Sequence, residues 1–289
     1  MRLAQENLGE IALVDIVKGL AKGKALDLED ARPILKNNYQ ISGFDDIERI
    51  KGSDIVVITA GLIRKPGMTR EELLRKNSQI DKEICLHIKE LAAQAIVIVI
   101  TNPLDLMTQL ALKITGFSAA RVIGMGISLD AARLANLISR QLDIPAIDIE
   151  PCVIGSHGEG MLVLPRLTKV KGVCLEEFLD KETIKSLVEK TLGRGLEIVT
   201  LLGAGSAYFA PSAAASVLVR SIVKDEKRVI GACACLSGEY GIKDVCIGVP
   251  CRIGREGIEK IIELELNQEE QRLLRQSAEK LKTQYRYIA

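Results

Sequence analysis

The stretch Ala95-Ile96-Val97-Ile98-Val99-Ile100-Thr101-Asn102-Pro103 is a continuous apolar run that ends in a polar turn. A short run without alternation of polar and apolar residues is typical of a strand buried on both faces of a parallel sheet. The run Asp54–Gly61 has the same character, and Glu10–Asp15 is a shorter example that ends in an acid. The sequence therefore predicts parallel strands with helices packed on both faces.

Helical segments alternate with these strands. Thr69 is followed three residues later by Glu72, which is a capping box, so we expect a helix to begin there and to run to about Gln94. A further helix is expected over 22–37, where a proline near the middle would break it, and two more over 103–115 and 128–142. Short strands are expected over 39–44 and 121–124. Strands alternating with helices predict a parallel sheet with right-handed crossovers.

The alternation changes after Leu142, and we place a domain boundary near Asp143. Strands are expected over 147–155, 161–164, 228–236 and 245–253, and helices over 175–202, 211–223 and 267–285. The predicted fold class is α/β, with a Rossmann-type parallel sheet in residues 1–143 and an α+β catalytic domain in residues 144–289.

Composition excludes several classes of protein. The 289 residues carry a formal net charge of +1, which gives no reason to expect nucleic acid or a membrane surface as a partner. No apolar run approaches the length of a membrane span, and no secretory signal is visible. The seven cysteines lack metal-ligand spacing, so we expect free thiols in a cytoplasmic protein and no metal site.

His157 is one of only two histidines, and glycines surround it in Gly155-Ser156-His157-Gly158. Glycine permits a sharp turn or the close approach of a ligand to the backbone. An imidazole there exchanges a proton near neutral pH, which suits a general base. The alternative is a structural histidine in a turn.

Polar or small residues stand where the predicted parallel strands end: Asp15, Gly61, Asn102 and Gly124. Open parallel sheets bind ligands at these carboxyl ends. Asp15 is placed to accept hydrogen bonds from a ribose diol and to repel a 2′-phosphate, which favours NAD over NADP. A solvated loop acid is the alternative.

Two groups of charged residues suggest an anionic substrate. Arg64 and Arg70 flank one short loop, and two guanidinium groups there bind planar oxyanions with paired hydrogen bonds. Asp130 and Arg133 share one face of a predicted helix, where the aspartate could orient a histidine and the arginine bind a carboxylate. The alternatives are a basic surface loop and a surface ion pair.

Taken together and in this order along the chain, these segments resemble the lactate/malate dehydrogenase family, and within it the malate dehydrogenases of the lactate-dehydrogenase-like type. Gly205-Ser206-Ala207-Tyr208 also looks like the helix of the family's substrate pocket. The resemblance implies NAD-dependent interconversion of (S)-malate and oxaloacetate, a place in the tricarboxylic acid cycle, and a homodimer or homotetramer.

The resemblance also implies roles for individual residues. His157 is the proton acceptor, Asp130 holds its imidazole, and Arg70 polarises the substrate carbonyl when the loop closes. The substrate is bound by Arg64, Arg70, Asn102 and Arg133. The cofactor is bound by Asp15, Asn77, Ile100, Thr101 and Asn102.

Arg64 is expected to select the substrate. Lactate dehydrogenases usually carry glutamine there, and an arginine facing the methyl group of pyruvate would be a buried unpaired charge. Oxaloacetate is therefore expected over pyruvate. A lactate or other 2-hydroxyacid dehydrogenase, and a truncated non-catalytic paralogue, are the alternatives.

The chain departs from the family pattern in two places. The sequence has no Gly-x-Gly-x-x-Gly motif, and residues 1–9 read as the last turns of the helix that should follow it. We expect the first strand and half a helix to be missing, about 20 residues, either because the natural start lies upstream or because the chain is truncated. Glu159 stands where the family usually has aspartate.

Overall fold

The computed structural model describes residues 1–62, 68–158, 160–203 and 205–288. The N-terminal half alternates strands and helices: α1 (Arg2–Gln5), β1 (Ile11–Val14), α2 (Leu20–Leu35), β2 (Ile41–Phe44), β3 (Ile55–Ile58), α3 (Arg70–Leu91), β4 (Ile96–Val99), α4 (Leu104–Thr115), β5 (Val122–Gly124) and α5 (Ile127–Leu142). The C-terminal half contains β6 (Ile149–Glu150), β7 (Val153–Gly155), β8 (Met161–Val163), β9 (Lys169–Val170), β10 (Val173–Cys174), α6 (Lys181–Leu202), α7 (Phe209–Val223), β11 (Arg228–Ser237), β12 (Lys243–Gly254), β13 (Gly257–Ile261) and α8 (Gln268–Tyr285). The predicted order of strands and helices is confirmed through α5.

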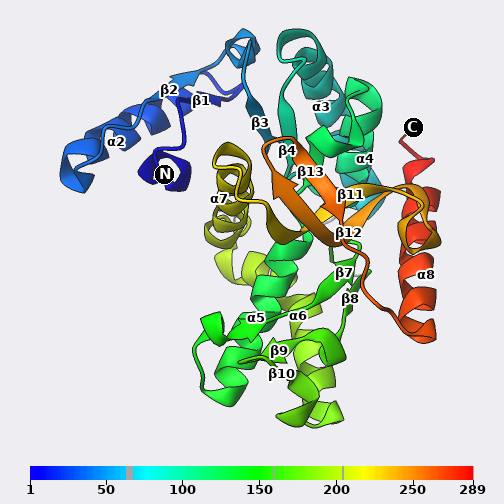
Figure 1. Ribbon diagram of the computed structural model, residues 1–289. Helices are drawn as coiled ribbons and strands as arrows, with labels where there is room; N and C mark the ends of the chain where they lie inside the picture. Colours follow the sequence, from blue (N-terminus) through cyan, green and yellow to red (C-terminus); the bar gives the residue numbers. More distant parts are fainter. Residues whose placement is uncertain (63–67, 159, 204, 289) are drawn as a thin grey trace.

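The main sheet joins both halves of the chain (Figure 1). In the described residues it has eight strands, ordered β3-β4-β5-β11-β12-β7-β8, with β13 paired to β12. β3, β4 and β5 are parallel, whereas Cys233 of β11 pairs antiparallel with Gly124 of β5. The parallel strands thus continue directly into the antiparallel strands, and the division of the chain at residue 143 stays a prediction.

β1 and β2 form a separate parallel pair, in which Ile11 lies opposite Ile41. Figure 1 shows this pair and α2 projecting to one side of the main sheet. Among the described strands, β1 pairs only with β2, and β3 only with β4. Each of β1 and β3 therefore has one edge whose backbone groups lack a strand partner.

The helix α4 lies deep in the core, with most of its residues buried. Four of these buried residues are polar, namely Asp105, Thr108, Gln109 and Thr115, and the first three share one face. Gln109 accepts a hydrogen bond of 2.7 Å from the backbone N–H of Cys246 on β12. A polar face on a buried helix needs such partners, and here α4 uses it to bind the C-terminal half.

Several predicted boundaries were wrong. The prediction of one strand over 147–155 fails because the segment is split into β6 and β7 around Pro151, which has no N–H to donate to a ladder. Residues 175–202 are helical from Lys181 onward, after a 3₁₀ turn, and the Asp180 side chain caps that helix. Pro33 lies in the last turn of α2 rather than interrupting it. The strands β9, β10 and β13 were missed.

Asp81 on α3 is a buried carboxyl group whose protonation affects the stability of the fold. Its side chain is fully buried, Oδ2 accepts from the Cys85 thiol at 3.8 Å, and Oδ1 has no partner in the described part of the molecule. Burial raises the pKa of Asp81 from 3.8 to about 7. Because the pKa of Asp81 is higher in the folded protein than in the unfolded chain, the buried carboxyl group is tolerated best when it is protonated. Its contribution to the free energy of unfolding is complete below about pH 3.8 and is lost as the pH rises through about 7.

We predict that Asp81→Asn is more stable than the wild type at pH 8, by about 2–4 kcal/mol, and that this difference shrinks as the pH falls to 5. Urea unfolding at the two pH values measures it. An exposed acid, changed in the same way as Asp30→Asn, serves as the control and should show no such trend. Equal pH dependence of Asp81→Asn and the wild type would contradict the prediction.

Candidate active site

His157 lies in the turn between β7 and β8. Gly155 and Gly158 adopt φ values of +93° and +90°, a region that glycine enters without strain. A Cβ on Gly155 would also meet the carbonyl oxygen of Gly160 at 2.6 Å. The glycines recognised in the sequence therefore shape the turn that presents His157.

The imidazole of His157 is held by Asp130. The Nδ1 atom lies 2.7 Å from Asp130 Oδ2, and Arg133 donates to the other oxygen of Asp130 at 3.2 Å. The Asp130 side chain is fully buried, and only 14% of the Arg133 side chain is exposed. The alternative of a surface ion pair is therefore wrong, and one helical turn of α5 places both charges beside the histidine.

The charges around His157 raise its pKa above the ordinary value. Burial is the largest influence and lowers the pKa, as does the positive charge of Arg133. The charge of Asp130, its hydrogen bond and the charge of Asp105 outweigh these two effects. With Nδ1 held by the carboxylate, Nε2 is the nitrogen free to exchange a proton with a ligand.

Two residues that hold the His157 turn were missed by the sequence analysis. Asp105 of α4 accepts the backbone N–H of His157 at 2.8 Å. Ser277 of α8 accepts the N–H of Ser156 at 3.2 Å and donates to the carbonyl of Gly160 at 3.0 Å. Neither belongs to a recognised motif, and the sequence separations of 52 and 121 residues gave no local signal.

The strand-end residues lie close to one another through hydrogen bonds. Asn77 is buried, donates to the carbonyls of Leu62 and Asn102 at 3.2 and 2.7 Å, and accepts from the N–H of Leu62 at 2.7 Å. Thr101 donates to the carbonyl of Ala60 at 2.6 Å. The amide of Asn77 thus serves to join the ends of β3 and β4, and its role toward a cofactor stays a prediction.

At the end of β1, Asp15 is half-buried and one of its oxygens accepts the N–H of Val17 at 2.9 Å. Its other oxygen has no partner among the described residues. Ile100 is half-buried and Asn102 is exposed at the end of β4. Asp15 fits the ribose of a dinucleotide, because one of its carboxylate oxygens remains to accept a hydrogen bond from a hydroxyl group.

Other predicted residues are placed only in part. Arg64 and Glu159 lie outside the described residues, and Arg70 is the first residue of α3. The segment 205–208 was predicted to be part of a helix, but it precedes α7, which begins at Phe209.

In the described ranges no group of three or more His, Cys, Asp or Glu residues is arranged to hold a metal ion. No described helix is both long and apolar enough to cross a membrane.

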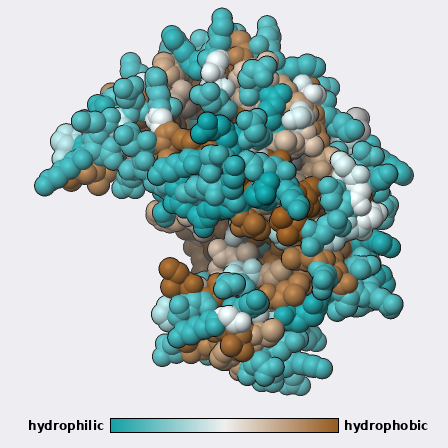
Figure 2. Space-filling view, in the orientation of Figure 1, coloured by the Kyte–Doolittle hydropathy of each residue, from teal (hydrophilic) through white to brown (hydrophobic). Residues whose placement is uncertain are grey.

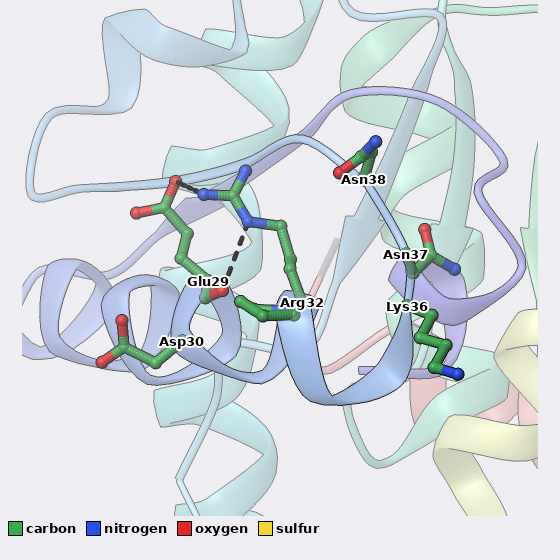
Figure 3. A pocket seen from close by; sticks show the side chains of 7 residues that line it. Glu29, Asp30, Arg32, Lys36, Asn37 and Asn38 are labelled. Carbon is green, nitrogen blue, oxygen red and sulfur yellow. Dashed lines mark hydrogen bonds and ion pairs between the residues drawn. The ribbon is translucent and has the colours of Figure 1, made fainter.

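A cavity of about 790 Å³ lies at the end of α2 (Figure 3), and α2 is far from β7 and β8, which flank the His157 turn (Figure 1). It is lined by Glu29, Asp30, Arg32, Pro33, Lys36, Asn37 and Asn38. The guanidinium of Arg32 is bonded to Glu29 and to the carbonyl of Tyr39. With its arginine engaged internally and no histidine in its lining, this cavity is not the candidate site.

A buried imidazole–carboxylate pair next to an arginine defines an enzyme class that moves a proton on an anionic organic molecule. Profiles of known families match both halves of the chain: residues 1–124 match the lactate/malate dehydrogenase NAD binding domain, and residues 127–288 match the α/β C-terminal domain of the same family. The chain belongs to the lactate/malate dehydrogenase family.

Individual relatives agree with this assignment. A malate dehydrogenase of Methanosarcina acetivorans is 46% identical over 97% of this chain and 92% of its own length. The apo structure of malate dehydrogenase from Picrophilus torridus has a TM-score of 0.95 and 39% identity, covering 99% of this chain and 91% of that one. A lactate dehydrogenase of Cryptosporidium parvum, solved with lactic acid and β-nicotinamide adenine dinucleotide, has a TM-score of 0.95 and 35% identity, covering 99% of this chain and 92% of that one.

Gly126 tests how closely the site is packed. A Cβ there would lie 2.9 Å from Leu104 Cδ2 and 3.1 Å from His157 Cβ. We predict that Gly126→Ala displaces His157, lowers kcat by about tenfold or more and destabilises the fold by about 1–3 kcal/mol. Gly23→Ala is the matched control, because nothing lies within 4 Å of its Cβ and alanine favours helix. Unchanged kcat and stability in Gly126→Ala would contradict the close packing.

Proposed function

We propose that the chain is an NAD-dependent malate dehydrogenase that interconverts (S)-malate and oxaloacetate. The observation that carries the proposal is Asp130, whose two oxygens bind His157 Nδ1 and Arg133 in one buried cluster. The names of relatives such as that of Methanosarcina acetivorans support the choice of substrate.

In this proposal His157 acts through Nε2. It takes the proton of the malate hydroxyl group, and Asp130 stabilises the imidazolium that results. In the reverse direction the same nitrogen returns the proton to the carbonyl oxygen of oxaloacetate. NAD, when bound, supplies the acceptor for the hydride from C2.

Arg133 is proposed to bind the carboxylate next to C2. It lies beside His157 because both contact Asp130, so a carboxylate on Arg133 brings the neighbouring hydroxyl group toward the imidazole. The family resemblance assigns Arg70 to the polarisation of the carbonyl and Asn102 to the substrate oxygen. Asp15, Asn77, Ile100, Thr101 and Asn102 are proposed for the NAD site.

We further propose that one strand belongs between β1 and β3. Support comes from their two open edges and from the absence of a Gly-x-Gly-x-x-Gly motif in the sequence. Such a strand and its glycine loop would complete the sheet and hold the pyrophosphate at a helix N-terminus.

The protein is proposed to form a homodimer or homotetramer in the cytoplasm. Large hydrophobic side chains on α6 and near the start of α7 are exposed, among them Leu196, Leu201 and Phe209. Figure 2 shows hydrophobic residues gathered across the middle of the face in view. All seven cysteines are free thiols, which suits a reducing compartment.

The direct test is an assay of the purified chain with NADH and either oxaloacetate or pyruvate, together with a titration of NADH binding. Faster turnover of oxaloacetate supports the proposal, and faster turnover of pyruvate favours a lactate dehydrogenase. Binding of NADH without turnover of either acid, or no binding at all, would favour the non-catalytic paralogue.

Arg64 is proposed to pair with the distal carboxylate of oxaloacetate. We predict that Arg64→Gln lowers the oxaloacetate-to-pyruvate ratio of kcat/KM by at least about 100-fold, because the ion pair with the second carboxylate is lost. Arg49→Gln, the same change at an exposed arginine, should leave the ratio unchanged. An unaltered ratio in Arg64→Gln would show that another residue selects the substrate.

A further inference from the structure

We propose that Asp105 is a second positioning residue for His157, which anchors its backbone and adds a negative charge that holds the proton on its imidazole. The geometry stands by itself, and only the consequence for turnover rests on the proposed dehydrogenase function. Asp130 contacts the imidazole ring from α5, whereas Asp105 contacts the backbone N–H of the same residue from α4.

Asp105 is built into the site rather than exposed near it. The residue is 4% exposed, and its Oδ2 accepts the backbone N–H of His157 at 2.8 Å. The second oxygen, Oδ1, is buried with no hydrogen bond by ordinary distance criteria among the described residues, and the only other donor beside the carboxyl group there is the Cys233 thiol, which is a weak donor. A buried carboxyl group with one unsatisfied oxygen costs stability, so its presence calls for a role other than packing.

The charges that face Asp105 make its contribution distinct from that of Asp130. Asp130 shares its negative charge with Arg133 through the 3.2 Å ion pair. Asp105 forms no ion pair with any described lysine or arginine. The groups that face it are His157, Asp130, the Cys233 thiol of β11 and the Cys246 thiol of β12. Its charge therefore acts on His157 without a cation that offsets it.

The protonation of the two groups is coupled. Burial raises the pKa of Asp105 to about 6, against the lowering effects of the His157 charge, the Cys233 thiol and the His157 N–H, while the charge of Asp130 raises it further. The position of Asp105 in the first turn of α4 favours its charged form through the helix dipole. When Asp105 is charged it raises the pKa of His157, so the pair releases its protons in coupled steps.

Nuclear magnetic resonance tests this in the intact chain, because the protein has only two histidines. His87→Gln assigns the signals, and the imidazole of His157 is then titrated in the wild type and in Asp105→Asn. Asparagine keeps an oxygen for the His157 N–H and removes the charge, so the pKa of His157 should fall while that of His87 stays constant. Asp81→Asn is the matched control, since it also neutralises a buried carboxyl group but one bonded to Cys85.

An unchanged pKa of His157 in Asp105→Asn would overturn the proposal. The wild type offers a second measurement that does not depend on how the variant folds: the amide proton of His157, which is donated to the buried Asp105 carboxyl group, should be protected from exchange with solvent. Exchange of that amide as fast as an exposed loop amide would also overturn the proposal.

Neither measurement needs turnover, so failure of the malate assay and failure of this inference are separate results. If the chain oxidises malate, the acidic limb of its kcat/KM profile should move to lower pH in Asp105→Asn. That direction follows because neutral His157 is the active base and its pKa falls when the charge of Asp105 is removed.

Discussion

The contact of 2.7 Å between Asp130 Oδ2 and His157 Nδ1 is the interaction on which the site depends. It joins α5 of the N-terminal half to the β7–β8 turn of the C-terminal half, in a place where the carboxyl group is fully buried. A buried carboxylate is stable only with partners, and here the imidazole and Arg133 provide them. Each of the three groups is thereby held in the orientation that acid–base chemistry on an organic acid requires.

The helix α4 also joins the two halves of the chain through buried hydrogen bonds. Its buried polar face reaches the C-terminal half at two separate points, His157 through Asp105 and Cys246 through Gln109. The main sheet joins the two halves as well, since β5 pairs with β11. The site is thus formed where the parallel and antiparallel parts of one sheet meet, and hydrogen bonds from α4 and α8 hold the histidine turn in place.

The sequence predicted the parallel strands and their helices well, because continuous apolar runs and a capping box are local signals. Thr69 and Glu72 form the reciprocal capping bonds that their spacing predicted. His157, Asp130 and Arg133 were identified before their geometry was known, through flanking glycines and a helical spacing of three. Their relative placement depended on family resemblance, since no local pattern brings residues 130 and 157 together.

What the sequence could not provide were contacts between distant segments and breaks within short strands. Asp105 looked like an ordinary residue in the first turn of a helix, and only the fold shows that it meets His157. The split at Pro151 and the two-residue strands β9 and β10 are too short for periodicity to detect. β1 and β2 are separate from the main sheet. This could not be predicted, because the sequence of one strand does not show which other strand it pairs with.

The most direct test of this account is the rate of malate oxidation by Asp130→Asn compared with the wild type, at saturating NAD. Asparagine preserves the shape of the side chain but removes the charge that stabilises protonated His157. The account predicts a loss in kcat of at least about 100-fold with NADH binding unchanged. Wild-type kcat in this variant would contradict it, because the buried carboxylate would then have no part in the reaction.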